Sequence, residues 1–283
     1  GATTGTATLD PTDDNVYEGD ETATIDISGV SGKSGVTENS TQQVSITISE
    51  NESAPTVTLA TSATSIAENA ASSLTLTATL SVATTADVTV ALSTSGTATE
   101  GTDYTDGSGN IDDIVISAGS TTGTVSFTPT DDSLYDATSN ETATIAISGV
   151  SGGSASESGT QSVTITITDN ENAPTVTLAT SGTSIAENSA STLTITATLS
   201  VATYQDVTVS IGSSGTATEG TDYGTVSDIT ISAGSTTGTA TFDPTDDSAE
   251  TDTVTATLAI TGVSGGSASE SGSQSVTISI LDD

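Results

Sequence analysis

The chain has 283 residues, with 37 acidic side chains and a single basic one, and its formal net charge at pH 7 is −36. It contains no Cys, which excludes disulfides and thiol chemistry, and no His, which removes the usual general base and the usual zinc ligand. It has neither a basic surface for nucleic acid nor an apolar run long enough to span a membrane, so we expect neither a nucleic-acid partner nor a membrane segment.

Residues 1–53 contain about three short runs in which apolar and polar residues alternate, the pattern of half-buried strands. They match only the second half of the sequence repeats that follow, so we interpret residues 1–53 as the C-terminal half of a repeat. About three strands cannot bury their own apolar face. The missing strands are therefore expected from upstream residues or from a neighbouring chain.

Residues 54–172 and 173–283 align with each other almost throughout and are predicted to be two complete repeats. Both begin with APTVTLAT and pass through SIAEN, GTATEGTDY and PTDD in the same order. Leu and Ala alternate with Thr in runs such as Leu74–Leu80, and clusters of Gly, Ser, Asn and Asp separate the runs. This pattern predicts an all-β fold of tandem immunoglobulin-like antiparallel β-sandwiches, with about seven strands per complete domain.

The junctions between repeats, residues 50–55 and 169–174, are short and acidic, and each ends in Ala-Pro. A residue that precedes proline favours extended backbone, so we expect stiff joints rather than flexible linkers.

Four segments recur in a fixed order in both complete repeats, namely SIAEN, GTATEGTDY, AGSTTGT and PTDD, and the first of these repeats closes with ITDNE. In that order they resemble the Calx-beta domain family, over both complete repeats and the second half of the first. The resemblance implies a seven-strand immunoglobulin-like sandwich that binds Ca²⁺ in loops at one end. Calcium takes six to eight oxygen ligands, which acidic loops can supply.

The resemblance also implies a set of ligands for each repeat. By position these are Asp13, Asp14 and Glu50 in the half repeat, Glu68, Asp103, Asp131, Asp132 and Asp169 in the middle repeat, and Glu187, Asp222, Asp246, Asp247, Asp282 and Asp283 in the last repeat. Two other interpretations stay open: the Asp-Asp pairs also suit simple turns, and the two glutamates of SIAEN also suit solvated loops. The number of ions per repeat stays open as well.

Without His, Cys or a paired base the chain offers no nucleophilic chemistry, so we do not expect an enzyme. Near-identical repeats build length rather than one unique site. We therefore expect a structural calcium-binding protein that self-associates into a rigid stalk, fibre or filament, outside the cell or on its surface and in a microbe. Two alternatives stay open: a calcium-sensing regulatory module of a larger membrane protein, and a ligand-binding adhesin.

Overall fold

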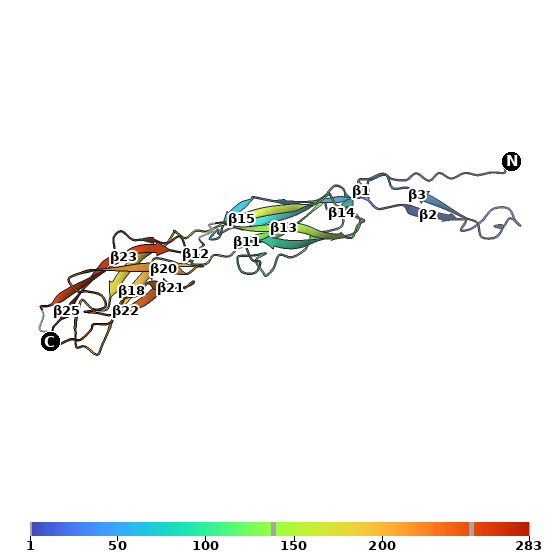
Figure 1. Ribbon diagram of the computed structural model, residues 1–283. Coiled ribbons are helices and arrows are strands. Elements are labelled where there is room, and N and C mark those ends of the chain that lie inside the picture. The colour runs from blue at the N-terminus through green and yellow to red at the C-terminus, as the bar shows by residue number, and fades with distance from the viewer. Residues whose placement is uncertain (1, 137–139, 249–251, 283) are drawn as a thin grey trace. The chain divides into compact units, whose positions relative to one another are not determined.

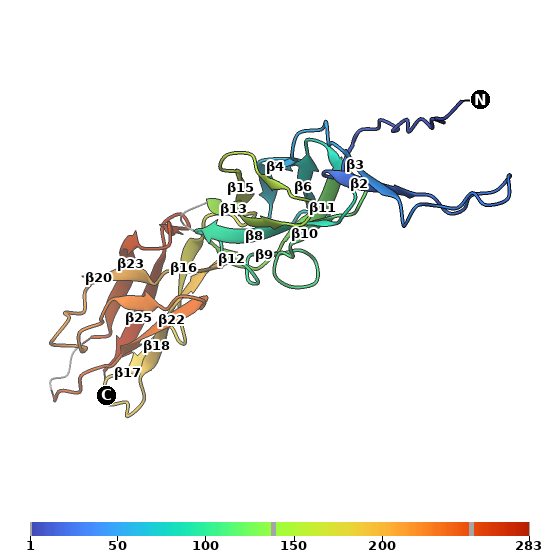
Figure 2. The ribbon, with the colours of Figure 1, turned by 90° about the vertical axis from the view of Figure 1, so that its right-hand side faces the viewer.

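The structure, a computed structural model, describes residues 2–136, 140–248 and 252–282, and every regular element within them is a strand (Figures 1 and 2). The chain divides into two compact units. Unit 1 comprises Gly1–Ile66, Ala71–Thr130 and Thr142–Thr166, and unit 2 comprises Ala67–Ala70, Asp131–Glu141 and Ile167–Asp283. Among the described residues, no helix has the length and apolar character needed to cross a membrane.

The strands that lie wholly or mainly in unit 1 form two five-stranded sheets, ordered β10-β8-β13-β15-β5 and β14-β4-β6-β11-β9, and the pairs β1-β7 and β2-β3. Their bounds are β1 Val16–Tyr17, β2 Glu21–Asp26, β3 Gln43–Ile48, β4 Thr56–Thr61, β5 Ser65–Ala67, β6 Leu74–Leu80, β7 Ala83–Thr84, β8 Val88–Gly96, β9 Tyr104–Thr105, β10 Ile114–Ile116, β11 Thr122–Pro129, β13 Asn140–Ser151, β14 Ser156–Glu157 and β15 Ser162–Thr168.

Unit 2 has the same plan, with sheets ordered β22-β18-β16-β24 and β17-β25-β23-β20-β21 and the pair β12-β19. Its strands are β12 Leu134–Tyr135, β16 Thr175–Thr180, β17 Ser184–Ala186, β18 Leu193–Leu199, β19 Ala202–Thr203, β20 Val207–Gly215, β21 Ile229–Ile231, β22 Thr237–Phe242, β23 Val254–Ser264, β24 Ser269–Glu270 and β25 Ser275–Leu281. The predicted all-β, immunoglobulin-like sandwich fold is confirmed.

The long strands pair antiparallel, whereas several short edge strands pair parallel. β4 lies antiparallel to β6, for example, but parallel to β14. In unit 2, β16 lies antiparallel to β18 and parallel to β24, and β17 lies parallel to β25. These parallel edges place residues that follow two different strands at the same end of a sandwich.

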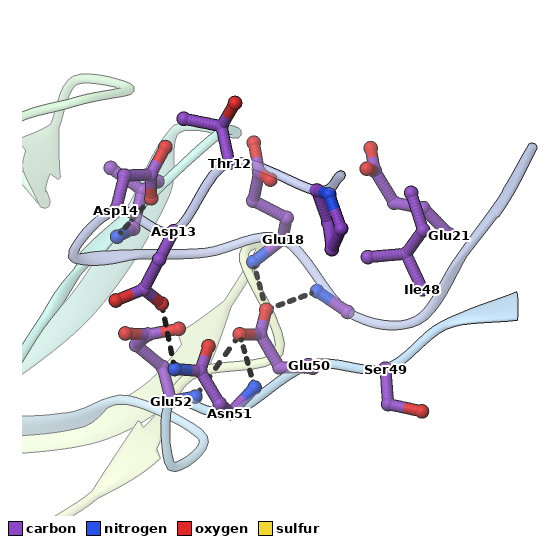
Figure 3. Close-up of a pocket in the computed structure, with 13 residues that line it drawn as sticks. Thr12, Asp13, Asp14, Glu18, Glu21, Ile48, Ser49, Glu50, Asn51 and Glu52 are labelled. Carbon is purple, nitrogen blue, oxygen red and sulfur yellow. Dashed lines mark hydrogen bonds between the residues drawn. The ribbon is translucent and has the colours of Figure 1, made fainter. Parts of the chain in front are cut away.

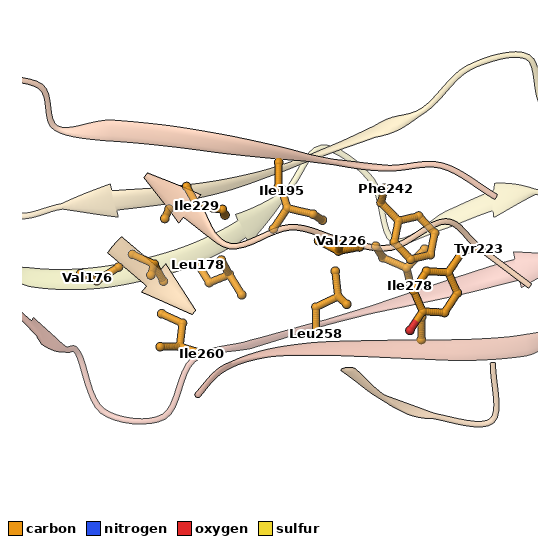
Figure 4. Close-up of a cluster of buried hydrophobic side chains, with 14 of the residues drawn as sticks. Val176, Leu178, Ile195, Tyr223, Val226, Ile229, Phe242, Leu258, Ile260 and Ile278 are labelled. Atoms are coloured by element: carbon orange, nitrogen blue, oxygen red, sulfur yellow. The ribbon is translucent and has the colours of Figure 1, made fainter. Parts of the chain in front are cut away.

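An aliphatic core lies between the two sheets of each complete repeat. In unit 2 it includes Ile195, Ile229 and Leu258, all fully buried (Figure 4). One aromatic pair closes the core at one end, where the rings of Tyr223 and Phe242 stack with centroids 4.7 Å apart. In unit 1 the pair Tyr104 and Phe127 stacks at the same centroid distance. The tyrosine of GTATEGTDY, a segment that both complete repeats contain, is therefore a core residue.

The hairpin β2-β3 carries an apolar face that the described residues leave open. Ile25 and Ile27 are each 47% exposed, whereas their counterparts in the middle repeat, Ile145 and Ile147, are 0% and 8% exposed. Strand β13, which holds Ile145, pairs with β8, and residues 1–53 contain no sequence that corresponds to β8.

Candidate metal centre

In each complete repeat, the pairing of an edge strand brings the glutamate of SIAEN next to the first aspartate of the closing segment. In unit 2, Ala186 pairs with Leu281, and the backbone N–H of Glu187 donates to the Leu281 carbonyl at 2.9 Å. Glu187 follows Ala186 and Asp282 follows Leu281, so the two acidic residues are neighbours at the end of this strand pair. The backbone N–H of Glu68 donates in the same way to the carbonyl of Thr168 at 3.0 Å, and the residue after Thr168 is Asp169.

Three half-buried carboxylates of unit 2, Glu68, Asp169 and Glu171, form what we call the acidic cluster. Each offers one oxygen, and these oxygens all lie within 4.8 Å of one another. Calcium binds oxygen at about 2.3–2.6 Å, so two ligand oxygens on opposite sides of one ion are roughly 5 Å apart. The spacing of the acidic cluster therefore fits a single calcium ion.

The side-chain amide of Asn170 lies among these carboxylates. Its nitrogen Nδ2 donates to Glu68 Oε1 at 2.9 Å, to Asp131 Oδ1 at 3.0 Å and to Glu171 Oε2 at 3.2 Å. An amide nitrogen has only two hydrogens, so it cannot make three linear bonds. Its partial positive charge stands where a cation would contact the same oxygens, and it brings Asp131 to the cluster.

The pKa values of Glu171 and Glu68 are both raised, because three negative charges in this cluster are partly buried and repel one another. Burial, together with the neighbouring carboxylates of Asp169 and Glu68, raises the pKa of Glu171 to about 8. Burial also raises the pKa of Glu68. Nearby like charges and desolvation both favour the neutral acid, and a bound divalent cation reverses that preference.

Both ends of the loop of residues 131–136 contact the cluster or its Asn170 amide. Asp131, at one end, accepts from the Asn170 amide, and Asp136, at the other end, donates to Asp169. Asp132 Oδ1 accepts a hydrogen bond from the Leu134 N–H at 2.6 Å, which is an Asx turn, so the turn interpretation of this Asp-Asp pair also holds. The N–H of Asp136 donates to Asp169 Oδ2 at 3.1 Å. The carboxylate of Asp169 also accepts the N–H of Glu171 at 3.2 Å through Oδ1.

The half repeat has a corresponding acidic hollow of about 380 Å³ (Figure 3). Glu50 points into it, and Glu50 Oε2 accepts the N–H groups of Glu18 at 2.5 Å and Gly19 at 2.7 Å. Backbone N–H groups, that of Glu18 above all and then that of Glu52, lower the pKa of Glu50 to about 2. Asn51 Nδ2 donates to Asp13 Oδ1 at 2.8 Å, as Asn170 does to Asp131. The longer Glu50 thus takes the place that Asp169 has in the middle repeat.

Asp14 repeats the role of Asp132, because its Oδ1 accepts the N–H of Val16 at 2.8 Å. Neither glutamate of SIAEN is a solvated loop residue, since Glu68 is half-buried and Glu187 is only 9% exposed.

Two predicted ligands stabilise turns instead of joining the acidic cluster. A carboxylate oxygen of Asp103 accepts the N–H of Thr99 at 2.6 Å, and Asp222 accepts the N–H of Thr218 at the same distance. Both aspartates immediately precede the core tyrosines, so each fixes the turn that leads into the core. Their assignment as ligands stays a prediction.

The remaining ligands predicted for the last repeat are not gathered as tightly. Asp246 and Asp247 are exposed, Asp282 is half-buried, and Asp283 lies outside the described residues. Among the described residues, the acidic cluster is the one group of three carboxylates whose oxygens come within ligand distance of one another. Sequence reasoning missed Glu171 and Asn170, although the recurrence of Asn-Glu after Asp169 and after Glu50 was a usable signal.

The Calx-beta domain family model matches residues 50–171 and 169–283. The chain belongs to the Calx-beta domain family. The resemblance drawn from its repeated segments is thereby confirmed, and the two matches are in tandem.

A search of curated proteins gave no match. Among solved structures, the chain is similar to CBD12 from CALX1.2, at 14% identity and a TM-score of 0.35, over 79% of this chain and 99% of that one. It is similar to the apo-form Calx CBD1 domain at 18% identity and a TM-score of 0.33, over 38% and 98%. It is also similar to the Yersinia pseudotuberculosis adhesin InvE at 13% identity and a TM-score of 0.33, over 79% and 58%.

Proposed function

We propose that this tandem Calx-beta chain binds Ca²⁺ at its acidic loops and serves as a calcium-stabilised, non-catalytic segment of an extracellular stalk or fibre. The observation that supports calcium most directly is the acidic cluster with the Asn170 amide at its centre. Three carboxylates within 4.8 Å offer only oxygen ligands, which suit a hard cation.

In this proposal Glu68, Asp169 and Glu171 hold the ion, and Asp131 adds an oxygen when Asn170 turns away. Ligands from flexible loops suit calcium, which accepts irregular geometry, better than magnesium, which demands a near-ideal octahedron. The half repeat supplies Asp13, Asp14 and Glu50 around its own hollow.

A bound ion neutralises carboxylates that otherwise repel one another, so it stabilises the folded form. An ion that binds only the folded chain stabilises it by about 2.7 kcal/mol when its free concentration is about one hundred times Kd. This linkage makes calcium a structural component of the repeats.

The structural part of the proposal rests on repetition. A chain of near-identical sandwiches with short acidic joints provides length and stiffness rather than a catalytic cleft. The apolar face of the β2-β3 hairpin is open among the described residues, and upstream residues or a neighbouring chain would close it. Calcium is plentiful outside cells, so an extracellular place on a microbe agrees with a site of carboxylates.

Calorimetric titration of the full chain with calcium tests the proposal. We expect saturable binding, and we expect Glu171→Gln to weaken or remove one class of sites. Asp112→Asn is the matched control, because Asp112 is exposed and outside the cluster. Absence of calcium binding by the unchanged chain contradicts the proposal, as does equal binding by the Glu171→Gln variant.

A further inference from the structure

The loop that carries Asp131 and Asp132 is held by residues about 70 positions further along the chain. Within unit 2, β12 pairs parallel with β19, with Leu134 opposite Ala202 and Tyr135 opposite Thr203. Thr203 is only 1% exposed, so this short pair is packed rather than a loose surface contact. The strand pair belongs to the last sequence repeat on one side and to the acidic loop of the middle repeat on the other.

Carboxylates hold both ends of β12, and one of them, Asp169, belongs to the acidic cluster. Asp132 Oδ1 accepts the N–H of Leu134, and Asp169 Oδ2 accepts the N–H of Asp136 at 3.1 Å. A displacement of β12 from β19 therefore moves Asp132 and disturbs Asp169. The position of Asp169 in the acidic cluster therefore depends on the pairing of β12 with β19.

Tyr204, the residue that follows β19, makes a second contact with the same loop. Its phenol hydroxyl donates a hydrogen bond to Asp132 Oδ2. Because Oδ1 of Asp132 is already bonded to the Leu134 N–H, the phenol fixes the rotation of the whole carboxylate. Tyr204 is nonetheless 51% exposed, so it contributes little to the hydrophobic core.

Unit 1 repeats this arrangement without the phenol. β1 pairs parallel with β7, with Val16 opposite Ala83 and Tyr17 opposite Thr84. Asp14 and Glu50 hold the two ends of β1 as Asp132 and Asp169 hold those of β12. The residue after β7 is Thr85, in the place of Tyr204. Both units therefore contain this short parallel strand pair, whereas the hydrogen bond from a tyrosine hydroxyl to the aspartate occurs in unit 2.

We propose that Tyr204 is a positioning residue for the acidic site of unit 2. Together with β19 it keeps loop 131–136 in the conformation in which Asp131 lies beside the Asn170 amide of the acidic cluster. The calcium site of the middle repeat is thus completed by a segment of the repeat that follows it. This inference rests on the proposed calcium binding and adds a residue that does not itself contact the ion.

The test compares Tyr204→Phe with the unchanged full chain, and it uses Tyr135→Phe as the matched control. Tyr135 lies in the same strand pair, but its hydroxyl forms no hydrogen bond with any residue that the structure describes. Calorimetric titration with calcium is expected to show about tenfold weaker binding at one class of sites in Tyr204→Phe, and unchanged binding in the control. Equal melting temperatures of the two variants and the unchanged chain in EDTA show that the phenol is not needed for folding.

A second readout uses terbium, which occupies oxygen-rich calcium sites and emits when a nearby tyrosine absorbs light. The chain has no Trp, so emission at tyrosine excitation reports tyrosines alone. Tyr204→Phe is expected to lose part of this emission at saturating terbium, and calcium is expected to compete it away. If the unchanged chain binds neither ion, the proposed function fails. If it binds calcium and Tyr204→Phe binds equally tightly, the positioning role is wrong, whatever the emission shows.

Discussion

Asn170 donates its side-chain amide to the carboxylate of Glu68 at 2.9 Å, although the two residues are 102 positions apart in the sequence. The same nitrogen reaches Asp131 and Glu171, so one neutral side chain serves three acidic ones. In a chain with a single basic residue, no lysine or arginine takes this place. We propose a divalent cation as the occupant of this place, and the predictions below follow from that proposal.

The double variant Asp131→Asn/Asp132→Asn is expected to lose calcium binding at the proposed site of unit 2 while its strands remain formed. Asp131 contacts the Asn170 amide, and Asp132 holds the loop through Leu134, so both the charge and the loop geometry change. Calorimetry measures the stoichiometry, and far-ultraviolet circular dichroism measures the strand content. Unchanged stoichiometry shows that these ligands are wrongly assigned.

In the absence of calcium, the contribution of Glu171 to stability is expected to decrease as the pH rises. Its pKa is about 8 in the folded chain and near 4.5 when the group is unperturbed, so the folded state binds more protons between these values. Stability from this group is therefore fully present at or below about pH 4.5 and is lost as the pH rises through about 8. Urea unfolding in EDTA across this range should show a smaller decrease for Glu171→Gln. The same pH dependence in both chains is the contrary result.

Removing the ring of Phe242 is expected to destabilise unit 2 without affecting the acidic hollow of the half repeat. Phe242 is fully buried and stacks on Tyr223, so Phe242→Ala creates a cavity that costs about 3–5 kcal/mol. Thermal unfolding should then show an earlier transition, with a later one that keeps its position. A single transition at the original temperature contradicts this account of the core.

The hairpin face of the half repeat offers a test of self-association. Ile25 and Ile27 are exposed where their counterparts are buried, so Ile25→Thr/Ile27→Thr is expected to reduce any association of the full chain in sedimentation experiments. Val115→Thr is the control, because Val115 is an exposed apolar residue outside the hairpin. Equal association in both variants shows that the hairpin face is not the contact.

The strands were predictable because alternation reflects burial directly. The run Leu74–Leu80 was identified from the sequence, and it is β6 with the same bounds. The acidic site was less accessible to prediction, since proximity depends on parallel edge pairing that alternation does not encode. Glu68 and Asp169 were predicted as ligands and lie in the acidic cluster, whereas Glu171 was missed although it is the third member.

Two further features had no local signal. Tyr204 contacts Asp132 across 72 positions and two sequence repeats, and a single exposed tyrosine gives no indication of such a partner. Asp103 and Asp222 carry the charge and spacing of ligands, yet their carboxylates accept backbone N–H groups four residues earlier. Charge alone does not distinguish a turn-stabilising aspartate from a ligand.

Thermal unfolding of the full chain, in calcium and in EDTA, tests the central claim most directly. Calcium that neutralises the acidic cluster should raise the melting temperature clearly, and magnesium should restore it poorly after chelation, because its small octahedral shell suits this irregular set of carboxylates badly. Superimposable melting curves in calcium and in EDTA would contradict the account.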